Sequence, residues 1–196
     1  MHHAFLVEDP ISLIQAWLDD ARAGVAEPNA MTLATATAEG MPSARVVLLR
    51  GIDERGLVFF TNRKSRKGDE LRTNPRAALV LHWSALGRQV RVEGRVEEVS
   101  GAESEAYWAT RPRGSQMAAW ASPQSQPLTD RAELNTRFEE VAARYGDDPV
   151  PLPPFWGGYR VIPDAVELWE HRNDRLHDRL RFTSENGSWR AERLAP

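Results

Sequence analysis

Hydrophobic and polar residues follow two different periods along this chain, and the first of them is helical. Asp9-Pro10 is a typical helix start, because Asp accepts hydrogen bonds from free amides and Pro suits the first helical position. Apolar side chains then recur at helical spacing, at Ile14, Trp17, Leu18 and Ala21. Gly24 is typical of a helix end. The pattern predicts an amphipathic helix between Asp9 and Gly24.

The next part of the chain has the alternation of a β-sheet. Five segments combine Thr and branched apolar residues and are separated by turn residues or polar stretches: Met31–Ala38, Ser43–Arg50, Leu57–Thr61, Ala77–Trp83 and Gln89–Val99. A short polar helix is predicted over Ser65–Thr73, ending before Asn74-Pro75. Strands at this spacing, without a helix after each one, favour an antiparallel barrel over alternating βαβ units.

The second half of the chain is predicted to be helical and then to return to the sheet. Residues 101–146 have a helical pattern with breaks at Arg111–Ser115 and Ser122–Pro127, and the proline-rich Pro149–Pro154 must be extended. The remaining strand signals are Tyr159–Ile162, Ala165–Glu170, and a hairpin of Leu180–Thr183 and Trp189–Leu194 around Asn186-Gly187. We therefore expect one mainly β domain over residues 1–196, a barrel with flanking helices, in which residues 1–8 are a disordered or tag-like N-terminus.

Composition narrows the class of protein. The 196 residues are 41% hydrophobic and 27% charged, a balance typical of a folded globular protein. The absence of cysteine excludes disulfides, thiolate catalysis and cysteine-held metal sites. The formal charge of −3 argues against a general nucleic-acid binder. Since no apolar run is long enough to span a membrane and no export signal precedes the first helix, we expect a cytoplasmic protein.

Basic residues at predicted strand ends and loops are the first candidates for chemistry. Arg45 and Arg50 lie an odd number of residues apart on one predicted strand, so a regular strand would place them on opposite faces. The segment Asn62–Gly68 carries two basic pairs at a predicted helix start, where free amides and the helix dipole favour an anion. A solvated basic turn is the alternative interpretation.

Two later segments leave the same choice open. Arg111–Gln116 is either an anion-binding loop or a surface turn. Arg175, His177 and Arg179 alternate in a predicted strand and so share a face, which must meet solvent or a ligand. The five histidines form no ligand cluster, so we expect no metal site. The common motifs of nucleotide-binding loops, serine hydrolases and zinc peptidases are absent.

Most of these candidates belong to short segments whose order and spacing are specific. The segments are Arg45–Arg50, Phe59–Asn62, Ser65–Gly68, Arg88–Gly94, Tyr107–Gln116, Ala119–Ser122, Gln124-Ser125, Phe155–Gly158, Arg175–Arg179 and Glu192–Pro196. In this order they resemble the pyridoxamine/pyridoxine 5′-phosphate oxidase family, and the resemblance runs from about Asp9 to Pro196. It implies a split β-barrel homodimer with one FMN in each of two clefts between the subunits.

The resemblance implies a role for each candidate. The positions that would bind FMN are Arg45, Phe60, Thr61, Arg66, Lys67, Gln89, Gln124, Ser125, Trp169 and Arg179. The positions that would bind substrate are Arg50, Tyr107, Arg111, Ser115, Arg175 and His177, and the last two would be catalytic. The implied reaction oxidises the 4′-carbon of pyridoxamine or pyridoxine 5′-phosphate by hydride transfer to FMN. Molecular oxygen then becomes hydrogen peroxide, and the product is pyridoxal 5′-phosphate.

Three features depart from the family pattern. Arg50 stands where the family has Lys at the substrate phosphate. After Trp169 the family usually has Gln-Gly-Gly or a similar sequence, and Glu170-His171-Arg172 stand there instead, which removes flexible glycines and adds charge. The N-terminal arm that often precedes the first helix is nearly missing. Two alternatives therefore stay open: a related flavin oxidase of the phenazine-pathway type, or a non-catalytic protein that binds flavin or pyridoxal phosphate. We expect neither nucleic acid nor a membrane as a partner.

Overall fold

One antiparallel sheet organises the chain. The computed structural model describes residues 9–196, so the expectation for residues 1–8 lies outside the described residues. The strands are β1 (Ala30–Ala36), β2 (Pro42–Leu48), β3 (Gly51–Asp53), β4 (Gly56–Asn62), β5 (Arg76–Trp83), β6 (Arg88–Glu98), β7 (Trp156–Glu170), β8 (Asp178–Glu185) and β9 (Ser188–Arg193). The helices are α1 (Pro10–Arg22), α2 (Arg66–Thr73), α3 (Gly101–Thr110), α4 (Arg113–Ala121) and α5 (Arg131–Tyr145), with 3-10 turns at η1 (Ser84–Leu86) and η2 (Asn173–Arg175).

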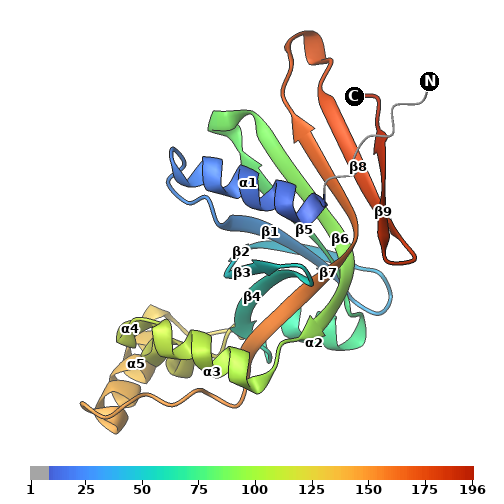
Figure 1. Cartoon of the computed structure of the whole chain (residues 1–196). Coiled ribbons are helices and arrows are strands. Elements are labelled where there is room, and N and C mark those ends of the chain that lie inside the picture. The colour runs from blue at the N-terminus through green and yellow to red at the C-terminus, as the bar shows by residue number, and fades with distance from the viewer. Residues whose placement is uncertain (1–8) are drawn as a thin grey trace, which may run out of the picture.

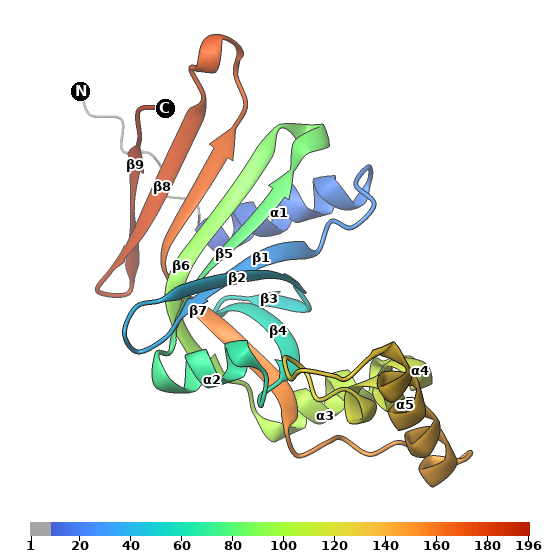
Figure 2. The same ribbon diagram turned by 180° about the vertical axis from the view of Figure 1, so that it is seen from behind.

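The strand order confirms the predicted mainly β, antiparallel architecture. It runs β2-β1-β5-β6-β7-β4-β3, with β8 paired to β7 and β9 paired to β8. The sheet curls into a half-barrel, α1 lies across one side of it, and α3, α4 and α5 gather at one end (Figure 1). The connection between β7 and β8 projects from the opposite end, and the view from behind shows β2, β3 and β4 (Figure 2).

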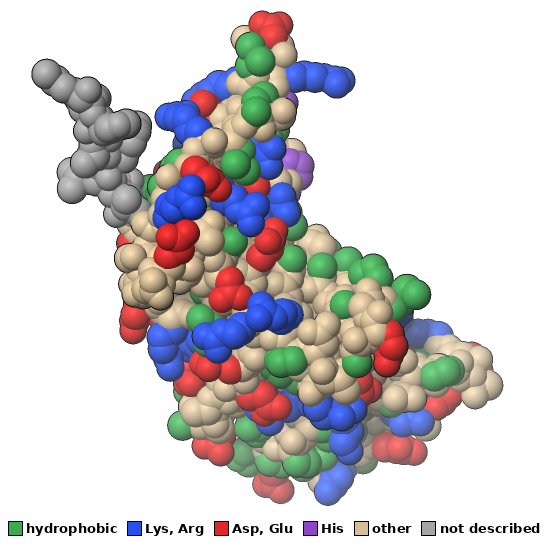
Figure 3. Space-filling view, turned by 90° about the vertical axis from the view of Figure 1, so that its right-hand side faces the viewer, with side chains coloured by type: hydrophobic (Ala, Val, Ile, Leu, Met, Phe, Trp, Pro, Cys, Tyr) green, Lys and Arg blue, Asp and Glu red, His purple; other side chains and the backbone are tan. Residues whose placement is uncertain are grey.

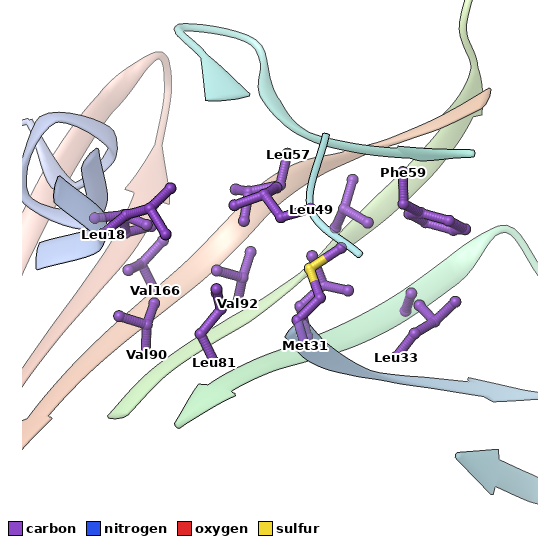
Figure 4. Packing of buried hydrophobic residues seen from close by; sticks show 14 of the residues in the cluster. Leu18, Met31, Leu33, Leu49, Leu57, Phe59, Leu81, Val90, Val92 and Val166 are labelled. Atoms are coloured by element: carbon purple, nitrogen blue, oxygen red, sulfur yellow. The ribbon is translucent and has the colours of Figure 1, made fainter. Parts of the chain in front are cut away.

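The main core lies between α1 and the sheet. Ile14, Leu18 and Ala21 are buried on one face of α1, which confirms the predicted amphipathic helix. Figure 4 shows Leu18 beside Val90 of β6 and Val166 of β7. Each fully buried side chain of this size contributes about 1.5–3 kcal/mol to folding. The predicted start is confirmed too, since the Asp9 side chain accepts from the amide of Ser12.

The long strand β7 corrects one prediction. The sequence predicts two strands separated by Pro163, whereas the structure has one continuous strand. Pro163 is tolerated because the register with β6 shifts between Glu93 and Gly94, and such a bulge frees the backbone position that a proline cannot use. A side chain at Gly94 would collide with the Ile162 carbonyl, so this crossing requires glycine. As a result β7 pairs with β4 through its first half and with β8 through its second.

The helical region places α3 against the start of β7. Its first predicted break, Arg111–Ser115, is too long, because α4 already begins at Arg113. Trp108 of α3 is buried with Val150 and Trp156, and its indole N–H donates to the Val150 carbonyl at 2.9 Å. This second core fixes α3 and the proline-rich segment beside β4.

The remaining elements largely follow the sequence. The hairpin of β8 and β9 turns at Asn186-Gly187, where both residues have the positive φ that a tight two-residue turn needs. The short strand β3 was not predicted, because it has only three residues. Within residues 9–196, no helix has the length and apolar character needed to cross a membrane.

Candidate functional site

A cavity of about 500 Å³ lies where β2, β4, α2 and α3 meet. It brings together ten of the predicted site residues: Arg45, Arg50, Phe60, Thr61, Arg66, Lys67, Tyr107, Arg111, Gln124 and Ser125. The prediction of opposite faces for Arg45 and Arg50 assumed one regular strand, and this condition is not met, because β2 ends at Leu48 and Arg50 lies beyond it. A cavity of this size is in the range of small-molecule sites.

Lys67 is the central cation at one side of the cavity. Its ammonium is buried and donates to Thr61 Oγ1 at 3.0 Å, Ser65 Oγ at 3.0 Å and Gln124 Oε1 at 2.8 Å. Among residues 9–196, no carboxylate lies within ion-pair distance of it. Burial, together with the nearby charge of Arg45, lowers the pKa of Lys67 to about 8. Such a cation is well suited to receive an anion.

Glu70 is a buried carboxylate that the sequence did not single out. It is only 4% exposed and accepts from Thr35 at 2.5 Å, Ser43 at 2.7 Å, Arg66 Nε at 2.8 Å and Arg45 Nη2 at 3.2 Å. Burial opposes its charge, but these hydrogen bonds outweigh it and lower the pKa of Glu70 to about 2. The ionised carboxylate therefore fixes two arginines of the cavity. The spacing of Arg66 and Glu70 on α2 was the available signal for it.

α2 starts at the cavity with free amides. Its cap residue, Ser65, makes no side-chain hydrogen bond to the first turn. Gly68 follows in that turn, and a side chain there would overlap the Arg63 carbonyl. The helix start therefore presents backbone donors beside Arg66 and Lys67, an arrangement that favours a phosphate.

Aromatic rings form the other side of the cavity. Tyr107 of α3 stacks on Phe60 of β4 with ring centroids 4.1 Å apart, and Trp156 lies 5.5 Å from Phe60. Arg111 follows α3 and lies over the Trp156 ring at 4.9 Å. Burial lowers its pKa, and its Nε is buried without a hydrogen-bond partner. Arg50 lies 5.7 Å from the Tyr107 ring, so a second cationic region adjoins the first.

Ser115 lies in an adjoining hollow. It lines a cavity of about 340 Å³ together with Phe60, Arg111 and Gln124, which also line the larger one. Arg111 Nη2 donates to the Ser115 carbonyl at 2.9 Å. The structure therefore places Ser115 next to Arg111, as the sequence predicts.

The other predicted residues form a second group near the β7–β8 connection. Gln89, Trp169 and Arg179 are cross-strand neighbours on β6, β7 and β8. The rings of Trp169 and His177 are 4.6 Å apart, and Arg179 Nε donates to Glu167 at 2.8 Å. The prediction that Arg175, His177 and Arg179 share a strand face is wrong, because Arg175 lies in η2 and β8 begins only at Asp178.

The two groups lie toward opposite ends of β7. Trp156 at its start contacts Phe60 and Arg111, whereas Trp169 near its end belongs to the second group. A strand rises about 3.3 Å per residue, so this separation is on the order of 40 Å along the strand. One copy of the chain therefore does not bring all the predicted residues into one cavity.

Two family models match the chain. "Pyridoxamine 5′-phosphate oxidase" matches residues 18–145, and "Pyridoxine 5′-phosphate oxidase C-terminal dimerisation region" matches residues 156–196. Among curated proteins, the chain is 56% identical to the pyridoxine/pyridoxamine 5′-phosphate oxidase of Rubrobacter xylanophilus, over 96% of this chain and 87% of that protein. It is 57% identical to the protein of the same name from Bordetella petrii, over 95% and 89%.

Solved structures agree with the fold. The crystal structure of PhzG from Burkholderia lata 383 in complex with tetrahydrophenazine-1-carboxylic acid has a TM-score of 0.91 at 37% identity, over 96% of this chain and 93% of that one. A pyridoxamine 5′-phosphate oxidase-related, FMN binding protein from Nostoc punctiforme has a TM-score of 0.78 at 19% identity, over 96% and 99%, and so supports the fold alone. The family models and the curated relatives together decide the assignment: this chain belongs to the pyridoxamine 5′-phosphate oxidase family.

Proposed function

We propose that this protein is an FMN-dependent oxidase that converts pyridoxamine and pyridoxine 5′-phosphate to pyridoxal 5′-phosphate, with oxygen reduced to hydrogen peroxide. The observation that carries the proposal is a pair of cationic regions in one cavity. Arg45, Arg66 and Lys67 form the first, and Arg50 and Arg111 form the second. Two neighbouring anion sites suit a phosphorylated cofactor beside a phosphorylated substrate. The names of the curated relatives support the same activity.

FMN fits the chemistry of the first region. The phosphate would be held by the Lys67 ammonium, the Arg45 and Arg66 guanidinium groups and the free amides of α2. Glu70 already fixes both arginines, so little side-chain freedom would be lost on binding. Gln124 and Ser125 line the same cavity and could bond to further polar atoms of the cofactor.

The second region would hold the substrate. Arg111 has unused donor capacity in a half-buried position against two tryptophans, which a phosphate would satisfy. Tyr107 and Arg50 would complete the anion site. A phosphate fixed there would place the pyridine ring in one orientation, and orientation of this kind lowers the barrier of the chemical step.

The reaction divides between cofactor and protein. When bound, FMN would supply the hydride acceptor and the redox chemistry that reduces oxygen. The chain's own residues bind and orient the substrate, and Arg175 and His177 would stabilise charge at the 4′-carbon as it is oxidised. Oxidation of the amine substrate gives an imine, which water hydrolyses to the aldehyde. Oxidation of the alcohol substrate gives the aldehyde directly.

We further propose that two copies of the chain complete each site. The second group, with Gln89, Trp169 and Arg179, would meet the cavity of the other copy, because the two groups of one copy lie far apart. The match to a dimerisation region over residues 156–196 supports a homodimer. So does strand β2, whose Val46 is 67% exposed at the rim of the cavity. A two-fold dimer would give two equivalent sites.

A flavin oxidase of the phenazine-pathway type is the second candidate function. The high structural similarity to PhzG favours it, since that structure holds a phenazine precursor. The cationic second region speaks for a phosphorylated substrate instead, because Arg50, Tyr107 and Arg111 line it together. The higher identity to the two vitamin B6 oxidases points the same way.

The assay that tests the proposal uses the purified protein. Its absorbance spectrum is recorded for bound flavin, and pyridoxamine or pyridoxine 5′-phosphate is then added under air. We expect a yellow protein that forms aldehyde and peroxide in equal amounts. A yellow protein without turnover on either substrate would favour the phenazine-type or non-catalytic alternatives. Protein that cannot take up FMN would contradict every interpretation in which the protein binds flavin.

The affinity for FMN is expected to weaken as pH rises through 8. Free Lys67 loses its proton with a pKa of about 8, and a bound phosphate would raise that pKa because it favours the charged form. The dissociation constant should therefore increase about tenfold between pH 7 and pH 9.5. Flavin fluorescence quenching measures it. Lys67→Arg should remove this pH dependence, and Lys64→Arg, at the exposed lysine three residues earlier, should keep it. A dissociation constant that does not change with pH in the native protein would contradict the proposal that Lys67 binds the FMN phosphate.

Arg175→Ala is expected to lower kcat/KM at least about tenfold, because the orientation and charge stabilisation at the 4′-carbon are lost. A value within about twofold of the native enzyme would refute this role.

A mixture of two variants tests whether sites form between copies. Arg175→Ala should have little activity, and Lys67→Met should be inactive through loss of FMN. If sites form between copies, a mixture of the two variants should recover about a quarter of native activity, since half the dimers are mixed and each has one intact site. No recovery after subunit exchange would contradict the shared site.

A further inference from the structure

The loop after β7 carries residues that the proposed function leaves unexplained. Glu170, His171 and Arg172 stand where the family resemblance implies Gln-Gly-Gly or a similar sequence. Asp174 and Arg175 have φ values of 57° and 62°, a left-handed backbone that costs free energy in residues other than glycine. A loop in this conformation must be held by contacts, and the three unexplained residues supply them.

Ion pairs run through this loop and beyond it. Arg172 Nε donates to Asp178 Oδ2 at 2.7 Å, and its Nη2 donates to Glu170 Oε2 at 2.6 Å. Glu170 also accepts from Arg88 at 3.2 Å, and Asp178 pairs with Arg193 at 3.2 Å. Figure 3 shows acidic and basic side chains interspersed on the upper part of the molecule, near a histidine. Charges joined in a network hold their geometry better than an isolated surface pair.

His177 is tied to the same loop through the backbone. The Arg172 amide donates to His177 Nδ1 at 3.2 Å. An imidazole nitrogen that accepts a hydrogen bond carries no proton, so the neutral ring has its proton on Nε2. Trp169 lies 4.6 Å and His171 5.2 Å from the ring, and the His171 amide donates to the Gly87 carbonyl at 2.7 Å. The amides of two neighbouring loop residues, His171 and Arg172, are therefore both hydrogen-bonded close to this imidazole.

We propose that Arg172 is a positioning residue for His177. Its guanidinium binds Glu170 on one side of the loop and Asp178 on the other, which keeps its own amide opposite Nδ1. His177 is thereby held in the tautomer that donates from Nε2. The consequence for catalysis rests on the proposed function, in which His177 faces the substrate, whereas the tautomer itself does not.

The tautomer is tested by NMR. Protein labelled with ¹⁵N-histidine is examined by long-range ¹H–¹⁵N correlation, and the His177 signals are assigned by their loss in His177→Gln. We expect the Nε2–H pattern in the native protein and a mixture with the Nδ1–H form in Arg172→Ala. Arg190→Ala is the matched control, since Arg190 is also an exposed arginine between two carboxylates, Glu185 and Glu192. It should leave the signals unchanged. An unchanged His177 pattern in Arg172→Ala, or an Nδ1–H pattern in the native protein, would overturn the proposal.

Steady-state kinetics test the catalytic consequence. Arg172→Ala is expected to lower kcat about tenfold with KM changed less than twofold, because the imidazole is misplaced while the phosphate anchor is intact. Arg172→Lys should recover part of the loss, since it keeps one ion pair but not the fork. If Arg172→Ala does not fold, Glu170→Gln removes the charge of one of the two carboxylates that hold Arg172 and should change the tautomer and kcat in the same direction. A shifted tautomer with unchanged kcat would overturn the catalytic part. Native protein without oxidase activity but with the expected spectra would contradict the proposed function and leave the tautomer assignment standing.

Discussion

Arg111→Met is expected to lower kcat/KM for pyridoxine 5′-phosphate about 100-fold, a loss of about 2.7 kcal/mol. Arg111 lies half-buried over Trp156 and Trp108, with its Nε unpaired. A phosphate bound there would gain charge-assisted hydrogen bonds in a site from which water is largely excluded. Methionine keeps the contact with the rings but has no donor. Steady-state kinetics with the phosphorylated substrate measure the loss.

The unphosphorylated vitamin is the internal control for this variant. Pyridoxine cannot use the anion site, so its low kcat/KM should be nearly the same in Arg111→Met and in the native enzyme. The fold should suffer little, because the variant loses one hydrogen bond, from Nη2 to the Ser115 carbonyl, and also removes the buried Nε that has no partner in the free protein. An equal loss for both substrates would mean that Arg111 shapes the cavity and does not bind phosphate. Arg111→Lys should fall in between, since it keeps the charge but not the planar fork.

Local signals explain why much of the fold could be predicted. Asp9-Pro10 and Asn186-Gly187 act through their own backbone geometry, so the α1 start and the β8–β9 turn follow from a few residues. The continuity of β7 could not be predicted, because Pro163 is accommodated by a bulge next to it, where Asp164 of β7 is left without a partner between Glu93 and Gly94 of β6. Only the pairing of β6 with β7 reveals that compensation.

The candidate site also has parts that could be predicted from the sequence and parts that could not. The helix start at Lys67 was visible because adjacent basic residues precede an expected helix. The role of Glu70 was not visible in the sequence, because a carboxylate on a short polar helix usually faces solvent. Its partners Thr35 and Ser43 lie on β1 and β2, far from it in the sequence. The proximity of His171 and His177 depends on the loop conformation at Asp174 and Arg175, which sequence spacing does not indicate.

The ion pairs of Arg160 should dominate the stability of the site's framework. Arg160 on β7 is only 2% exposed and donates to Asp53 at 2.5 Å and to Glu103, on α3, at 2.8 Å. The double variant Asp53→Asn/Glu103→Gln would leave this arginine buried without a carboxylate. We expect the free energy of unfolding to fall by about 3 kcal/mol. This is toward the low end of the values for broken buried ion pairs, because both carboxylates reach solvent. The melting temperature, measured by calorimetry, should then fall by about 10 °C.

Adding Arg160→Met to the double variant shows whether the stability is lost through the unpaired charge of Arg160 or through altered packing. If the charge is the cause, the triple variant should melt several degrees above the double, because an apolar side chain of similar length needs no partner. A triple variant no more stable than the double would show that Arg160 acts through its own packing. The ion pairs also bear on the site, since Glu103 lies one turn before Tyr107 on α3, whose ring stacks on Phe60. At temperatures where the double variant remains folded, its KM for the phosphorylated substrate should therefore be higher than that of the native enzyme. The triple variant should keep this raised KM, because the residue at position 103 no longer ties α3 to β7.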